Sequence, residues 1–250
     1  MVKSLDLRNQ HNWLGPRRSA RIDPGVSNDW EFDAMRVIYL NLLVLMAISV
    51  PAFGQTAADP WLILASGEQG SINVHTTRED LVRKYGAANV VDRDEVDSSG
   101  FTVHVTVLFP RDSRRCLEIS WRDEKETAPA FITITGAPKR WHAVHNISTG
   151  MSLKELEQLN GGPFQLAGFG WDYEGTIESW ASGSLAGDLD TGHGRVLIRL
   201  CPPLRKDVSQ KEFDEVTGSG SFPSSHPIIQ KLNPRIFEMT WLFPEPVKAE

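Results

Sequence analysis

The sequence predicts an α+β protein built from two tandem units, each a short capped helix packed on an antiparallel β-meander. Two helix-start signatures support this, because Thr77 and Asp80 recur as Ser152 and Glu155 at a constant offset of 75 positions. Segments that alternate apolar and polar residues follow each signature, which is the period of a half-buried strand. With 250 residues and 40% hydrophobic residues, the chain can bury a substantial core.

The N-terminal region has the layout of an export signal. Residues 1–34 form a polar upstream segment, and residues 35–54 combine Arg36, a 14-residue apolar run and small residues before a cleavage site after Gly54. The run is shorter than the roughly 20 residues that span a bilayer, which disfavours the alternative of a membrane anchor. We therefore expect a periplasmic or secreted mature chain without a stable membrane span. The sequence leaves open whether translation starts at Met1 or at Met35.

The first unit is expected over residues 61–138. The segment WLILASG from Trp61 is apolar enough for a first strand, and a helix runs from Thr77 to Gly86. Three strands then follow, and they are predicted over residues 101–109, 116–121 and 131–135.

The second unit is expected over residues 139–250. Its helix begins at the capping box of Ser152 and ends at Gly161. Strands are predicted over residues 164–180, 195–200 and 236–243, and a long mobile loop is predicted over residues 202–227.

A resemblance rests on the second helix. Gly150-Met151-Ser152, Glu155-Leu156 and Leu159-Asn160-Gly161-Gly162-Pro163 resemble the corresponding helix of the small accessory lipoprotein of the outer-membrane β-barrel assembly machine. A tandem pair of such units resembles the β-lactamase-inhibitor-protein fold. This resemblance implies protein binding across a sheet face without catalysis. The chain departs from the lipoprotein because it has two units and no cysteine at the cleavage site.

Three aromatic residues are the candidate binding site. Phe169, Trp171 and Tyr173 alternate along the predicted strand, so their side chains would share one side of it. Aromatic side chains supply much of the energy of protein interfaces, but the alternative that the same three residues cover the helices as core is favoured.

A rival interpretation is a metal- or carboxylate-dependent hydrolase. His142 and His145, with His193 further along, offer imidazole ligands, and Asp172 and Glu174 form a carboxylate pair. The histidines follow no known ligand spacing, and such carboxylates are commonly the solvated side of a strand. We therefore expect no catalytic residue, no metal site and no cofactor.

The two cysteines leave an alternative open. Cys116 and Cys201 are the only cysteines in the chain, and an even number in an exported protein is consistent with a disulfide. Both are out of phase with the apolar residues of their strands, but two separate thiols fit the sequence equally well.

The sequence therefore predicts an exported, non-enzymatic protein that binds an envelope protein or another envelope component. The net charge of −6 and the pI of about 5.7 argue against nucleic-acid binding, which requires a clustered basic surface. Neither the partner nor the oligomeric state follows from the sequence.

Overall fold

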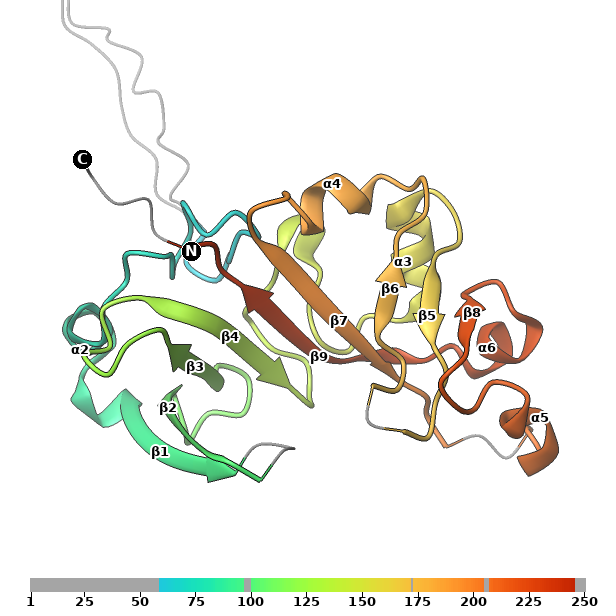
Figure 1. The fold of residues 1–250 in the computed structure, drawn as a ribbon, viewed down its shortest axis with the longest axis horizontal. Coiled ribbons are helices and arrows are strands. Elements are labelled where there is room, and N and C mark those ends of the chain that lie inside the picture. The colour runs from blue at the N-terminus through green and yellow to red at the C-terminus, as the bar shows by residue number, and fades with distance from the viewer. Residues whose placement is uncertain (1–58, 97–99, 172, 205–206, 246–250) are drawn as a thin grey trace, which may run out of the picture. The chain divides into compact units, whose positions relative to one another are not determined.

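The computed structural model describes residues 59–96, 100–171, 173–204 and 207–245. Within these residues the protein is α+β, as predicted, with an antiparallel six-stranded sheet in the order β1-β2-β3-β4-β9-β7 and a three-stranded sheet in the order β6-β5-β8 (Figure 1). None of the described helices is long and apolar enough to cross a membrane. The predicted upstream segment and export signal lie outside the described residues.

An antiparallel meander forms the first part of the large sheet. It consists of β1 (Val90–Val96), β2 (Thr102–Leu108), β3 (Leu117–Trp121) and β4 (Pro129–Thr135). The sequence predicted the last three of these strands. It did not predict β1, because the segment VVDRDEV is exposed and charged, as edge strands commonly are.

The prediction of a strand from Trp61 is wrong. Residues 61–67 make only isolated bridges, from Leu62 to His142 and from Ile63 to Gly70. Ile63 is nevertheless completely buried, so the apolar character of this segment reflects core packing without a ladder of hydrogen bonds.

Both predicted helices are present with their capping boxes. In α2 (Arg78–Tyr85) the side chains of Thr77 and Asp80 cap each other's backbone N–H groups, and Leu81 is buried. In α3 (Leu153–Asn160) Ser152 and Glu155 do the same. Because each helix has only 8 residues, burial of its apolar side must supply most of its stability.

Shorter helical segments were not predicted. They are η1 (Ala87–Asn89), η2 (Val144–Asn146), α4 (Leu185–Leu189), α5 (Gln210–Asp214) and α6 (Pro227–Leu232). The region predicted as a long loop over residues 202–227 contains α5 and the strand β8 (Ser221–Pro223), so it is more ordered than expected.

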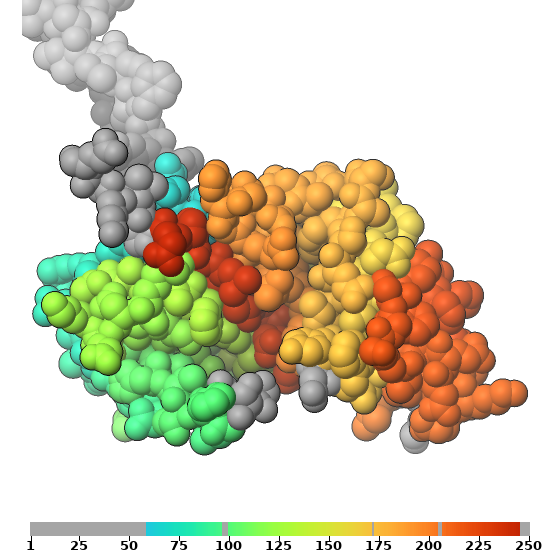
Figure 2. All heavy atoms as spheres, in the orientation of Figure 1, coloured from blue at the N-terminus to red at the C-terminus, as the bar shows by residue number. Residues whose placement is uncertain are grey.

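The C-terminal strand joins the two halves of the chain. β9 (Arg235–Leu242) pairs with β4 on one side and with β7 (Arg195–Cys201) on the other. Figure 2 shows this late segment, in red, at the surface between the green first half and the orange residues around β7. Strands of both predicted units therefore share the six-stranded sheet, while the smaller sheet contains only strands of the second unit.

The stretch predicted as one aromatic strand is divided into two. β5 (Gln165–Ala167) and β6 (Ile177–Ser179) are separated by a loop that contains Phe169, Trp171 and Tyr173. Gly170 and Gly175 have positive φ angles of 82° and 62°, which break the extended conformation.

The six-stranded sheet has two different sides. One side carries Ile119, Ile132 and Trp241 and packs into the main core with the apolar side chains of the helices. The other, which we call the open face, follows from strand alternation and carries Val107, Glu118 and the hydrogen-bonded pair Thr133–Thr240. Most of its polar side chains are half-buried.

We predict that Gly175→Ala strongly destabilises the protein. A Cβ atom at Gly175 would lie 1.9 Å from the carbonyl oxygen of Leu200, at the junction where Leu200 N donates to Gly175 O over 2.9 Å. Both the clash and the positive φ oppose the substitution, so we expect a loss of several kcal/mol, about 3 or more, in urea unfolding.

Gly187→Ala is the matched control for this prediction. Gly187 lies within α4, and a Cβ atom there would meet no atom within 4 Å. We expect it to leave stability unchanged or to raise it by up to about 1 kcal/mol. Equal unfolding midpoints for Gly175→Ala and the wild type would contradict the proposed constraint at the sheet junction.

Candidate functional site

The hairpin of β1 and β2 brings charged side chains together at the edge of the large sheet. Its antiparallel register places Asp94 opposite His104 and Asp92 opposite Thr106. Residues opposite each other in this way have adjacent side chains on the same face. His104 Nδ1 accordingly lies 2.9 Å from Asp94 Oδ1.

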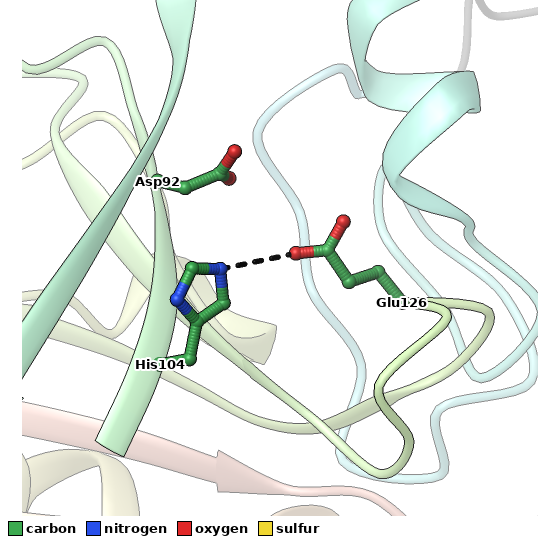
Figure 3. Close-up of side chains that lie close together, drawn as sticks. All are labelled: Asp92, His104 and Glu126. Atoms are coloured by element: carbon green, nitrogen blue, oxygen red, sulfur yellow. Dashed lines mark ion pairs between the residues drawn. The ribbon is translucent and has the colours of Figure 1, made fainter. Parts of the chain in front are cut away.

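A tight turn between β3 and β4 supplies Glu126. Asp123 holds this turn, since its carbonyl oxygen accepts from Glu126 N over 3.0 Å and its side chain accepts from Lys125 N over 2.8 Å. Glu126 has a positive φ of 57°, which is unusual for a residue with a side chain. The turn directs its carboxylate toward the hairpin, where Oε1 lies 3.5 Å from His104 Nε2 (Figure 3).

Arg78, the first residue of α2, connects these elements. Its guanidinium donates to both oxygens of Asp92, over 3.0 Å from Nε and 2.7 Å from Nη2, and its Nε lies 3.4 Å from Glu126 Oε2. The buried Thr106 hydroxyl donates to Asp92 Oδ1 over 2.9 Å and accepts from Trp121 Nε1 over 2.8 Å. A continuous polar network therefore runs from the helix start to Trp121.

The charges in this network shift the pKa values of its members. Burial by itself would raise the pKa of Asp92, but hydrogen bonds from Arg78 and Thr106 outweigh it and hold that pKa below its usual value. The hydrogen bond with Asp94 raises the pKa of His104 above its ordinary value, and the nearby carboxylates act in the same direction. Asp92 is therefore ionised at neutral pH, and a positive charge is favoured close to it.

A pocket of about 540 Å³ lies beside the network. Val103, Trp121 and Phe131 give it apolar and aromatic walls, while Glu124 and Glu126 add carboxylates. Such a pocket suits a ligand with an apolar part and a basic group, because the stem of a basic side chain can pack on the walls while its head meets the carboxylates.

The three aromatic residues predicted as a binding site have different environments. Phe169 is completely buried and stacks on Phe213 with ring centroids 6.1 Å apart, so it belongs to the core. Trp171 is half-buried and donates from its indole to Gly168 O, while Tyr173 is 66% exposed and packs edge-on against Trp171. Only Trp171 and Tyr173 are therefore accessible to a partner.

The histidines considered in the hydrolase interpretation are in separate places. His142 Nε2 lies 3.1 Å from Asp59, and His145 Nε2 lies 2.7 Å from Asp188. Among the residues that the structure describes, only Asp92, His104 and Glu126 form a group of three side chains able to hold a metal ion. His193 is exposed and outside this group.

The carboxylate pair of that interpretation is described only in part. Glu174 accepts a hydrogen bond from Gly170 N over 2.9 Å and so fixes the loop, while Asp172 lies outside the described residues. The structure therefore gives no geometry in which these two carboxylates share one reaction.

Cys116 and Cys201 are free thiols. Cys116 immediately precedes β3 and Cys201 ends β7, and the sheet order places β4 and β9 between these two strands. Three strand spacings of about 4.8 Å separate them by about 14 Å, whereas disulfide-bonded residues have Cα atoms about 4.4–6.8 Å apart. The alternative of two separate thiols therefore describes this structure.

Comparisons with protein-family models, with curated proteins and with solved structures give no significant match to this chain.

The charged network was not predicted from the sequence. Asp92 and Glu126 lie 34 positions apart, and no motif connects them with His104. Recognition of the β1–β2 hairpin would have suggested the Asp94–His104 pair, because register alone sets it. The position of Glu126 depends on the turn at Asp123, which only the structure reveals.

We predict that Asp94→Asn lowers the pKa of His104 toward its ordinary value of about 6.5. The substitution removes the charge that most favours the protonated ring. A pKa raised on folding means that protonated His104 stabilises the native state below pH 6.5, and that this contribution disappears as the pH rises through the raised value. NMR titration of the His104 ring in a chelating buffer measures the shift.

Asp188→Asn is the control for this titration, because Asp188 pairs with His145 and not with His104. It should leave the pKa of His104 unchanged. An unaltered His104 titration in Asp94→Asn would show that the hydrogen bond to Asp94 does not control this histidine.

Proposed function

We propose that this protein is an exported, non-enzymatic binding protein that contacts a protein partner of the cell envelope through the open face of its large sheet. The observation that carries the proposal is a group of exposed apolar side chains at the β1–β4 end of that face. We call it the open-face patch, and it consists of Val91, Phe101, Val103 and Phe131.

The patch differs from ordinary scattered surface residues. Phe131 is 41% exposed and Phe101 is 69% exposed, although both are large and aromatic. Val105 and Val107 continue the same side of β2 from Val103 and are buried without belonging to the main core. Exposed apolar side chains with aromatic members on one side of a sheet are consistent with a protein interface.

The pocket beside the patch favours a partner segment that carries a basic side chain. Val103 and Phe131 belong to both the patch and the pocket, so one ligand can contact both. Arg122 also borders the pocket, but its guanidinium is bound to Pro244 O over 2.9 Å and to Glu245 over 2.6 Å. Glu124 and Glu126 are thus the groups that would attract the partner.

Two sequence features support the remaining parts of the proposal. The segment over residues 35–54 supports export, because it has the three parts of a secretory signal. The resemblance to the helix-plus-sheet modules of the assembly machine and of the β-lactamase-inhibitor-protein fold supports protein binding. A second surface, formed by Trp171 and Tyr173, is a further candidate contact because Tyr173 is so exposed.

Photocrosslinking in cells distinguishes these surfaces. We predict that a photoreactive residue at position 103 gives one recurrent protein adduct in the envelope fraction, while position 211 on the distant helix α5 gives none (Figure 1). Adducts from position 173 instead would assign binding to the Trp171–Tyr173 surface. If neither position 103 nor position 173 gives a protein adduct in a well-expressed, exported protein, the proposal is overturned.

We further predict that Phe131→Ser weakens capture of the crosslinked partner about 10-fold or more, as loss of an aromatic anchor typically does. Phe237→Ser is the matched control, since Phe237 is 44% exposed and lies outside the patch. A pull-down with purified variants of equal stability measures the difference. Equal loss of binding in both variants would contradict a specific role for the patch.

A further inference from the structure

We propose that Asp92, His104 and Glu126 form a binding site for a divalent transition metal such as zinc, with Asp94 as the residue that orients His104. This site shares His104 and Glu126 with the pocket beside the open-face patch, but the observations that carry it are separate from those for partner binding. It rests on four features of the network: the positions of the donor atoms, the two carboxylates on opposite sides of His104, the local charge and the free lone pair of Asp92.

The donor atoms are near the spacing that a metal requires. One ligand atom from each of Asp92, His104 and Glu126 can be chosen so that all three lie within 4.8 Å of one another (Figure 3). Donors about 2.0–2.2 Å from a tetrahedral zinc ion lie about 3.3–3.6 Å apart. His104 Nε2 and Glu126 Oε1 are already 3.5 Å apart. Asp92 supplies the third ligand atom within the same 4.8 Å limit.

His104 has the environment of a metal ligand. Its Nδ1 faces Asp94 at 2.9 Å, so an N–H on that nitrogen donates to the carboxylate and leaves the lone pair of Nε2 directed at Glu126. A carboxylate on the non-ligating nitrogen is the usual support of a metal-bound histidine. His142 and His145 each face a carboxylate through one nitrogen only.

The charge around the site fits a doubly positive ion. Asp92, Asp94 and Glu126 carry three negative charges, and Arg78 supplies one positive charge. With a neutral histidine, two negative charges remain, and a divalent cation balances them. Side-chain exposures of 32% at Asp92 and 55% at His104 leave room for water to complete the coordination.

Arg78 does not occupy every acceptor position of Asp92. Oδ1 accepts from both Arg78 Nε and Thr106, whereas among the described contacts Oδ2 accepts only from Arg78 Nη2. A carboxylate oxygen has two lone pairs, so Oδ2 can bind a metal while it keeps its hydrogen bond. Arg78 then acts as the group that fixes Asp92 in place. The longer contact of Arg78 with Glu126, at 3.4 Å, is the one that the metal would replace.

Calorimetric titration of the tag-free protein with zinc chloride tests this site. We expect one zinc ion per chain, with binding at least about 10-fold weaker in His104→Gln and in Glu126→Gln. Asp94→Asn should weaken binding about 10- to 100-fold, as loss of a supporting carboxylate does. His145→Gln, which removes the exposed histidine paired with Asp188, should bind zinc as the wild type does.

Thermal unfolding with zinc and with a chelator checks that the variants are folded. Zinc should raise the melting temperature of the wild type by mass action but not that of His104→Gln, while both should melt normally in the chelator. Wild-type affinity no greater than that of His104→Gln, or equal losses in His104→Gln and His145→Gln, would overturn the site. Crosslinking from position 103 in the presence of chelator distinguishes the two proposals. Adducts that persist in chelator, with no zinc binding, would exclude only the metal site. Zinc binding without adducts would exclude only the proposed binding function.

Discussion

The insertion of β9 between β4 and β7 is the constraint on which the rest of the structure depends. Trp241 of β9 is completely buried, and its indole donates to Ile63 O over 3.0 Å, so the last strand also fixes the first described segment. The same strand holds the start of α3, because Ile236 O accepts from Gly150 N over 2.8 Å. These contacts join residues up to 178 positions apart. Their loop-closure entropy must be overcome before the core exists, which favours late, cooperative completion of the sheet.

This arrangement also explains why the two sides of the sheet differ. Apolar side chains of α2, α3, α4 and the N-terminal segment belong to the same core cluster as Ile132 and Trp241. The described chain places no helix against the patch at Val103 and Phe131. Contact of this apolar surface with water is unfavourable in free energy, so a partner that covers the surface would be stabilised. The fold therefore leaves apolar side chains exposed on one side of the large sheet.

Local signals predicted the elements, whereas long-range pairing determined the site. The capping boxes at Thr77 and Ser152 and the alternation in β2, β4, β7 and β9 were sufficient to place those elements, because each depends on neighbouring residues. The aromatic strand failed because glycines with positive φ interrupt the alternation at Gly170 and Gly175. Whether Cys116 and Cys201 can be bridged, and which residues meet in the Asp92–His104–Glu126 group, depend on strand order and register. Periodicity alone does not specify either of these.

The charged edge of the sheet has two physical explanations, and they make different demands on the residues. Charges on β1 protect an exposed edge strand from pairing with other chains, and any charged residue serves this purpose. A cation site makes a stronger demand, because its side chains must converge on one point. The backbone N–H of Arg78 donates to Glu126 O over 3.0 Å while its guanidinium binds Asp92, so one residue positions the helix, the turn and the edge strand together. Edge protection does not require a strained turn at Glu126 or a carboxylate on each side of His104. The arrangement of these charges, more than their number, is what favours a bound cation.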